Sequence, residues 1–203
     1  HMEIKEFLHK SPKLNQIPKP GTKSQLKMAP PGRTYYEKTN TLRFAATVML
    51  FYPINTKIHF CLIRRTLKTT IHSNQVCFPG GEKEKSDKNY WNTGLREMNE
   101  EIGVKQDQVV YITELSKLFI PVSNFIVFPY MARIEKRPSF LINDSEVEYL
   151  IEVKLSMLLS KDSIGKSNIS NRKVPIFNFK GEHVWGATAM ILAEARDLFL
   201  SLK

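Results

Sequence analysis

The sequence predicts a mixed α/β fold, and three observations support this prediction. Segments rich in β-forming residues recur between Phe44 and Arg133. Among them, Tyr90–Ile102 has the spacing of an amphipathic helix. A final amphipathic helix is marked by apolar residues on one face: Ile191, Leu192, Ala195, Leu198, Phe199 and Leu202. Strands interleaved with helices are typical of α/β domains.

Residues 1–40 predict an N-terminal arm, and residues 41–203 predict one domain. The arm is rich in proline and lacks sustained periodicity. We therefore expect a short helix over Met2–Leu8 and an extended course beyond it, lying on the domain. The arm has eight Lys or Arg residues and three acids, hence a charge of +5, which a solvated tail explains most simply. His1 and Met2 resemble a cloning remnant and are set aside.

The first part of the domain predicts a β-hairpin and a loop. Phe44–Tyr52 and Lys57–Ile63 are rich in β-formers, and Pro53-Ile54-Asn55 between them predicts a hairpin loop. Arg64–Val76 is polar and predicts a loop. Cys77–Gly81 predicts the end of a short strand followed by a glycine turn.

The helix predicted over Tyr90–Ile102 has one apolar stripe, and further elements follow it. Gly103 stands where the end of a helix favours a residue with positive φ. The stripe has the 4-3-4 spacing of a buried face and consists of Trp91, Leu95, Met98 and Ile102. Strands are expected over Val109–Phe119, Phe125–Arg133 and Val174–Phe179, and a short helix over Val153–Leu159.

Three carboxylates lie on the other side of this helix. At about 100° per residue, Glu97, Glu100 and Glu101 share one sector, roughly 140° from the apolar stripe. Neighbouring carboxylates repel one another unless a cation offsets their charge, and Mg²⁺ prefers oxygen ligands of this kind. A solvated acidic helix face is the alternative, and the three acids alone leave both interpretations open.

The surrounding residues resemble the Nudix box, G-x5-E-x7-R-E-U-x-E-E-x-G-U, where U is a bulky aliphatic residue. Gly81 is the first glycine, and Arg96–Val104 matches the second half. Asp87 takes the place of the first Glu, and eight residues rather than seven separate it from Arg96. The resemblance covers roughly residues 41–200. It implies a Nudix-type α/β/α sandwich with a mixed β-sheet between helices.

Other motifs are similar to those of the coenzyme A pyrophosphatase branch of this superfamily. The run from His72 to Gly81 resembles its H-x-G-Q-x-x-F-P-G-G signature, and that branch has the same extra residue in its box. Glu146-Val147 with the downstream Val153 resembles its E-V-x5-V-P-L stretch, and Trp185–Ala189 resembles its W-G-x-T-A motif. Thr70 stands where the branch has a second Arg.

The resemblance implies a catalytic divalent metal ion, Mg²⁺ or Mn²⁺. Glu97 and Glu101 are its leading ligands, with Glu100 joining directly or through water and the carbonyl of Gly81 adding an oxygen. We expect Arg96 to orient a carboxylate through a two-pronged hydrogen bond.

Roles are also implied for residues outside the box. Glu146 is the candidate general base, unless it caps the short helix near Val153 or is solvated. Arg65 contacts a phosphate or is an ordinary surface residue. His72 and Gln75 line the entrance, unless His72 is a structural or solvated residue of a polar loop. Three aromatic residues could stack on a base, although alternating aromatics in a strand more often belong to a core: Phe125, Phe128 and Tyr130.

We therefore expect a metal-dependent hydrolase that cleaves the pyrophosphate bond of a nucleoside diphosphate derivative. Coenzyme A or acyl-CoA is the preferred substrate, giving 3′,5′-ADP and phosphopantetheine, and ADP-ribose or a dinucleotide is the alternative. The net charge of +10 favours anionic partners and, with the basic arm, keeps an RNA 5′-end or cap enzyme as another alternative. A non-catalytic nucleotide-binding module is the last, although the intact acids oppose it. The oligomeric state stays open.

The sequence also bears on the compartment. No apolar run approaches the roughly 20 residues of a membrane span, so we expect no membrane partner. Cys61 and Cys77 lie in apolar stretches without zinc-site spacing, which predicts buried, reduced thiols and a cytoplasmic protein.

Overall fold

A mixed β-sheet forms the centre of the fold. The computed structural model describes residues 3–33, 42–67 and 74–202. Its main-sheet strands are β1 (Arg43–Ile54), β2 (Lys57–Arg65), β3 (Val76–Cys77), β4 (Gly80–Glu82), β5 (Val110–Glu114), β6 (Leu118–Ile120), β7 (Phe125–Arg133) and β8 (Val147–Lys154). Within these described ranges the order is β3-β2-β1-β7-β5, with β4 on β1, β6 on β7 and β8 on β2. Strands β1 and β7 run parallel, and the other neighbours are antiparallel.

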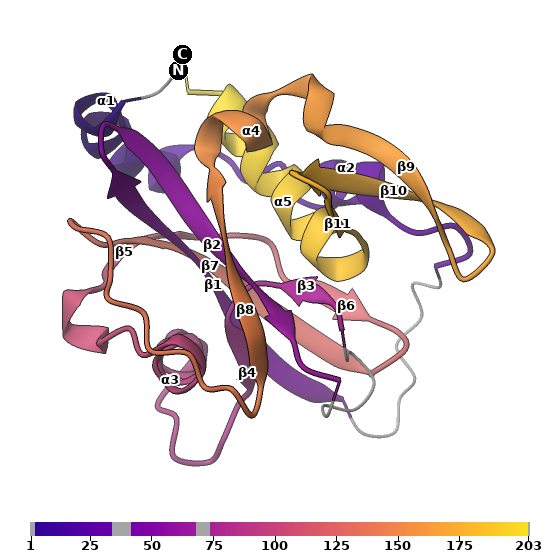
Figure 1. Cartoon of the computed structure of the whole chain (residues 1–203), viewed down its shortest axis with the longest axis horizontal. Coiled ribbons are helices and arrows are strands. Elements are labelled where there is room, and N and C mark those ends of the chain that lie inside the picture. The colour runs from indigo at the N-terminus through magenta and orange to yellow at the C-terminus, as the bar shows by residue number, and fades with distance from the viewer. Residues whose placement is uncertain (1–2, 34–41, 68–73, 203) are drawn as a thin grey trace.

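Helices lie on both faces of this sheet (Figure 1). Helix α3 (Tyr90–Ile102) covers one face, and α5 (Gly186–Leu200) covers the other. Successive residues of β1 point to opposite sides, so Val48 and Leu50 pack in the cluster under α3 whereas Phe51 packs in the cluster under α5. The expected α/β/α sandwich with a mixed sheet between helices is therefore confirmed.

The N-terminal segment folds onto the α5 side of the sheet. It contains α1 (Ile4–Lys10), the 3-10 helices η1 (Ser11–Gln16) and η2 (Leu26–Met28), and α2 (Thr22–Gln25). A short helix at its start is confirmed, but the extended course expected beyond it is wrong for η1, α2 and η2. The physical reason is burial, because Phe7, Leu14 and Met28 insert into the core cluster under α5. The domain boundary at residue 40 stays a prediction.

A second, three-stranded sheet follows β8. The chain passes through α4 (Leu155–Leu159) and η4 (Lys161–Ser163) into β9 (Ile164–Ile169), β10 (Arg172–Phe179) and β11 (Glu182–Val184). These strands pair antiparallel in the order β11-β10-β9. Phe177 and Phe179 of β10 are buried in the α5-side core, which fastens this sheet to the domain.

The structure shifts several predicted boundaries. Strand β1 runs on through Pro53 and Ile54, so the hairpin turn is Asn55-Thr56, and Asn55 has a φ of +54°. The glycine turn expected at the end of Cys77–Gly81 is wrong, because Gly80 and Gly81 belong to β4 and pair with β1. The strand expected over Val109–Phe119 divides into β5 and β6. The 3-10 helix η3 (Gln106–Gln108) lies between α3 and β5.

Candidate active site

Helix α3 is positioned by local signals at both ends. The Asn89 side chain caps its start by accepting a hydrogen bond from the Asn92 backbone N–H at 2.9 Å. Gly103 ends it with a φ of +72°. Met98 and Ile102 are fully buried against the sheet, which turns the acidic face of the helix toward β4 and the end of β2.

Arg96 connects the acidic residues of this face. Its Nε and Nη2 donate to Oδ1 and Oδ2 of Asp87, both at 3.0 Å, so the two-pronged hydrogen bond expected of Arg96 is present and Asp87 is its partner. Its Nη1 also donates to Glu97 Oε1 and Glu100 Oε2, each at 2.9 Å. The hydrogen bonds from Arg96 are the largest cause that lowers the pKa of Asp87, to about 2, and Thr93 adds a hydroxyl donor at 3.0 Å.

Glu101 lies fully buried beneath this face. Its Oε2 accepts the Gly80 backbone N–H at 2.8 Å, and its Oε1 accepts Arg65 Nη1 at 3.0 Å. Burial raises the pKa of Glu101 to about 8, although the Arg65 charge and the Gly80 N–H act in the opposite direction. Arg65 is thus an ion-pair partner of a buried carboxylate, and the alternative that it is an ordinary surface residue is wrong. Its expected contact with a phosphate stays a prediction.

The two glycines of β4 bring the backbone against these carboxylates. A Cβ on Gly81 would lie 2.5 Å from Cδ and Oε2 of Glu97, so only glycine leaves room for that carboxylate. Gly80 has a φ of +152°, and a Cβ there would lie 2.3 Å from the carbonyl oxygen of Ala46. The Glu97 carboxylate therefore rests on the β4 backbone at Gly81. The metal contact expected of the Gly81 carbonyl remains a prediction.

Glu146 reaches the same place from another part of the chain. It immediately precedes β8, and its carbonyl accepts the Thr66 N–H at 3.0 Å, next to Arg65. Its negative charge is one of the smaller causes that raise the pKa values of Glu97 and Glu101, and burial is the largest. The alternative that Glu146 caps a helix near Val153 is wrong, because β8 follows it and α4 begins later, at Leu155.

The donor set suits a divalent cation. Burial is the main cause that raises the pKa of Glu97, and the charges of Glu100 and Glu146 add to it, so like charges accumulate here. A divalent ion offsets such repulsion, and Mg²⁺ and Mn²⁺ take carboxylate and carbonyl oxygens. In the part of the chain that the structure describes, no three His, Cys, Asp or Glu side chains are gathered closely enough to form a complete metal site. Glu97, Glu100, Glu101 and Glu146 are the residues that could hold an ion.

Comparison with known proteins identifies the family. The NUDIX domain model matches residues 43–168, more than half of the chain. The chain belongs to the Nudix family. An uncharacterised Nudix hydrolase, NudL of Photorhabdus laumondii, is 29% identical over 172 residues, covering 83% of this chain and 89% of the relative. A probable nudix hydrolase of Schizosaccharomyces pombe is 29% identical over 153 residues, covering 74% of this chain and 54% of the relative.

A solved structure supports the fold. The MutT/nudix family protein from Enterococcus faecalis superimposes with a TM-score of 0.56 at 14% identity, covering 82% of this chain and 65% of that one. The expected superfamily is thus confirmed, and the protein is a pyrophosphohydrolase of the Nudix type. Nudix hydrolases generally use divalent metal ions.

The helices of this Nudix hydrolase, over its described ranges, are too short or too polar to cross a membrane.

Of the two residues expected at the substrate entrance, only Gln75 lies within the described ranges. Gln75 is half-buried beside β3, and its carbonyl accepts the Arg65 N–H at 3.1 Å. His72, like Thr70, lies outside the described residues.

Phe128 and Tyr130 of β7 pack against α3, whereas Phe125 packs against the α5-side core and has the Arg43 guanidinium carbon 4.2 Å from its ring centroid. Phe128 stacks on Tyr90 with ring centroids 3.8 Å apart, and the mostly buried Tyr130 meets Trp91 edge-on at 5.4 Å. These rings contact one another on the α3 side of the sheet. This packing agrees with the core interpretation rather than with base stacking.

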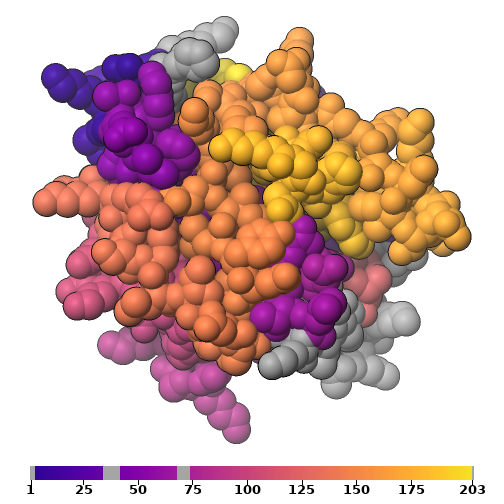
Figure 2. Space-filling view, viewed as in Figure 1, coloured from indigo at the N-terminus to yellow at the C-terminus, as the bar shows by residue number. Residues whose placement is uncertain are grey.

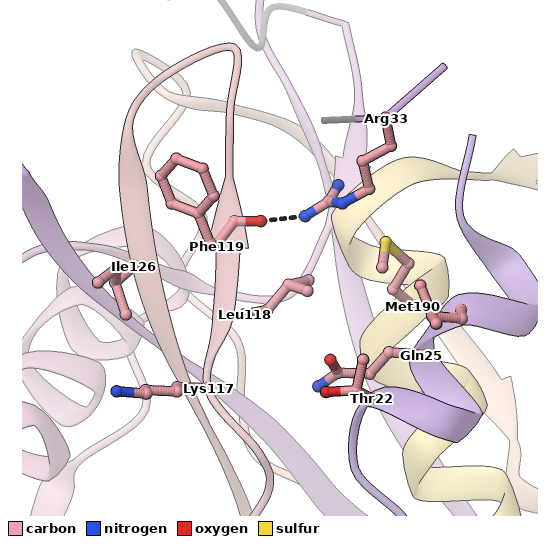
Figure 3. Close-up of a pocket in the computed structure, with 9 residues that line it drawn as sticks. Thr22, Gln25, Arg33, Lys117, Leu118, Phe119, Ile126 and Met190 are labelled. Atoms are coloured by element: carbon pink, nitrogen blue, oxygen red, sulfur yellow. Dashed lines mark hydrogen bonds between the residues drawn. The ribbon is translucent and has the colours of Figure 1, made fainter. Parts of the chain in front are cut away.

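A separate cavity of about 190 Å³ lies between the N-terminal segment and β6 (Figure 3). Leu118 and Met190 form part of its wall, and Arg33 donates a hydrogen bond to the Phe119 carbonyl at its rim. None of the acidic residues described above lines this cavity. The acidic face of α3 therefore remains the candidate active site of this Nudix hydrolase.

The sequence did not reveal how these residues are held. Arg65 and Glu101 are 36 positions apart, and no local pattern pairs them. The hydrogen bond from the Thr93 hydroxyl to Asp87 was also missed. Thr93 lies one helical turn before Glu97, so it could have been tested from sequence as a neighbour of Asp87.

Proposed function

We propose that this Nudix hydrolase cleaves coenzyme A or an acyl-CoA at its pyrophosphate bond, releasing 3′,5′-ADP and phosphopantetheine or its acyl derivative. One observation carries the hydrolytic part of the proposal. The carboxylates of Glu97 and Glu101 lie against the Gly80–Gly81 backbone, and the charge of Glu146 acts on both of them. A bridging P–O–P group needs such a site, because its own oxygens are anionic and bind through a shared cation.

The metal would be held by carboxylates of α3. Glu97 and Glu101 are the proposed ligands of Mg²⁺ or Mn²⁺, with Glu100 joining directly or through water and Gly81 offering its carbonyl. When bound, the ion neutralises phosphate oxygens and lowers the pKa of a coordinated water.

The remaining groups orient and accept protons. Arg96, anchored by Asp87, holds Glu97 and Glu100 at fixed positions through bonds of 2.9 Å. Arg65 holds Glu101 in the same way and keeps further N–H groups that can reach a phosphate. Glu146 is the proposed general base, accepting a proton from the attacking water, and Gln75 is proposed to line the substrate entrance.

The preference for coenzyme A rests on the similarity of three segments and of the box spacing to the coenzyme A pyrophosphatase branch, and the charge of +10 suits the extra phosphate of this substrate. ADP-ribose or a dinucleotide is the second candidate within the same reaction class. An RNA enzyme is less favoured because two cations of the basic arm have partners within the protein: Lys27 pairs with Asp197, and Lys19 donates to Thr113. The free thiols of Cys61 and Cys77 lead us to propose a cytoplasmic enzyme.

A substrate panel tests this proposal. Coenzyme A, ADP-ribose, NADH, a diadenosine polyphosphate and capped RNA are incubated with the enzyme and Mg²⁺ or Mn²⁺, and products are separated by chromatography. We expect coenzyme A to give the highest kcat/KM and Glu101→Gln to abolish turnover of every substrate. Fast cleavage of another compound with coenzyme A untouched would refute the proposed specificity.

A further inference from the structure

A groove lies along β8 on the side of the sheet away from α3. It has a volume of about 290 Å³, comparable to roughly ten water molecules. One wall is β8, and the other is the β10–β11 turn, which lies next to it on the surface shown in Figure 2. Apolar residues such as Ile151, Met157 and Phe179 line part of the groove, and the polar residues Tyr149, Glu152, Lys180 and Glu182 line the rest.

The groove begins next to the candidate active site. Strand β8 starts directly after Glu146, and Tyr149 at the groove mouth is three residues further on, about 10 Å away at 3.3 Å per residue. Across the β2–β8 pair, Tyr149 faces Arg64, and Val147 faces Arg65. The end of the groove at Tyr149 is therefore the end nearer to Glu146 and Arg65.

Hydrogen bonds hold the mouth of the groove in place. Arg64 Nε donates to the Tyr149 hydroxyl at 2.9 Å, and that hydroxyl donates to Glu182 Oε1 at 2.8 Å. Arg64 also forms an ion pair with Glu182 of β11. These contacts link β2, β8 and β11, so both walls of the groove are fixed relative to Arg65.

The groove offers both apolar and amide-binding groups. Five consecutive residues, 149–153, line it, so the backbone of β8 is exposed to it as well as the side chains. Among the strands in the described ranges, β8 pairs only with β2, and its other edge has N–H and C=O groups that can bind an extended amide chain. Alternating amides and methylene groups are the chemistry of a pantetheine arm, whereas a ribose has neither.

We propose that this groove binds the pantetheine arm of the substrate and so determines specificity, an inference that rests on the proposed function. The phosphates occupy the acidic site on the α3 side. The arm passes the end of β2 and lies along β8, and an acyl group extends toward Met157 and Phe179.

A variant of Met157 tests the inference. Met157→Trp fills the groove, and the control Leu26→Trp places the same ring in the separate cavity of Figure 3. For each variant, kcat/KM is measured for coenzyme A and for the methyl ester of 3′-phospho-ADP, which has the diphosphate but no arm. We expect Met157→Trp to lower the ratio of the two values about ten-fold, while the Leu26→Trp control keeps the wild-type ratio. An unaltered ratio in Met157→Trp overturns the inference.

A binding measurement separates this inference from the proposed function. Phosphopantetheine is titrated into the metal-free wild-type protein, and backbone amide shifts are followed by NMR. Shifts confined to β8 and the β10–β11 turn support the groove, and their absence overturns it even if coenzyme A is cleaved. If coenzyme A is not cleaved, or if Met157→Trp does not fold, the proposed function and the groove are still judged separately, because this titration needs neither turnover nor a variant.

Discussion

Asp87→Asn isolates the contribution of the Asp87–Arg96 pair. The Asp87 side chain is only 5% exposed, and its hydrogen bonds from Arg96 lower its pKa from 3.8 to about 2. At about 1.4 kcal/mol for each pH unit, this difference stabilises the folded protein by roughly 2 kcal/mol at neutral pH. Because asparagine has no charge to pair with Arg96, we expect the variant to lose about this amount of unfolding free energy at pH 7.

The pH dependence of stability gives a sharper signature. A carboxyl whose folded pKa is lowered contributes fully above its unfolded pKa, and the contribution disappears as pH falls through the folded value. For Asp87 this window runs from about pH 4 down to about pH 2. Urea unfolding with EDTA present is measured across this range for the wild type, Asp87→Asn and the exposed control Asp107→Asn.

Two results would refute this reasoning. One is a loss below about 1 kcal/mol at pH 7 in Asp87→Asn. The other is an acid transition between pH 4 and 2 that is as steep in Asp87→Asn as in the wild type. We also expect lower hydrolytic activity in the variant, since Arg96 holds Glu97 and Glu100 while it is anchored by Asp87.

Three further predictions concern the carboxylates of the site. Glu101→Gln should lower kcat by at least about a hundred-fold. Because the folded pKa of Glu101 is raised, the free energy of unfolding of the metal-free wild type should fall as pH rises from about 4.5 to about 8. Glu101→Gln should remove this fall, and pH-dependent urea titrations measure it in both proteins. Arg65→Met leaves Glu101 without its cation, so above about pH 8, where Glu101 is ionised, it should lower the free energy of unfolding by about 3 kcal/mol, with Arg65→Lys restoring part of it in the same assay. Gly81→Ala should displace Glu97 and weaken Mn²⁺ binding by calorimetry about ten-fold or more, whereas Gly165→Ala, with its nearest atom at 3.9 Å, should bind like the wild type.

The parts of the fold that sequence predicted well are those specified by local signals. For α3, an apolar stripe and a glycine after the last turn agreed, and the observed bounds are Tyr90–Ile102. The strands β1, β2 and β7 were also predicted, since each is a long run of β-forming residues in the centre of the sheet.

Strand β8 was missed because its burial follows no alternation. Val147 and Val153 are buried, but the residues between them are half-buried or exposed, since this edge strand lines an open groove. The bulge opposite Arg64 and Arg65 further breaks the period of two.

The N-terminal segment was misread for a related reason. Its buried residues, Phe7 and Leu14, lie in separate short helices and share no repeating pattern.

Two buried carboxylates show which part of a site is readable from sequence. Glu101 and Glu194 are both fully buried on helices with apolar neighbours. Glu194 accepts bonds from the Gly21 N–H, the Gln25 amide and the Ser116 N–H and hydroxyl, all neutral donors from segments that it fastens to α5. Glu101 differs because other carboxylates lie beside it, and this like-charge neighbourhood, which the box spacing on one helix predicts, is what a metal ion relieves. Burial alone therefore does not mark a functional acid, whereas clustering of acids around it does.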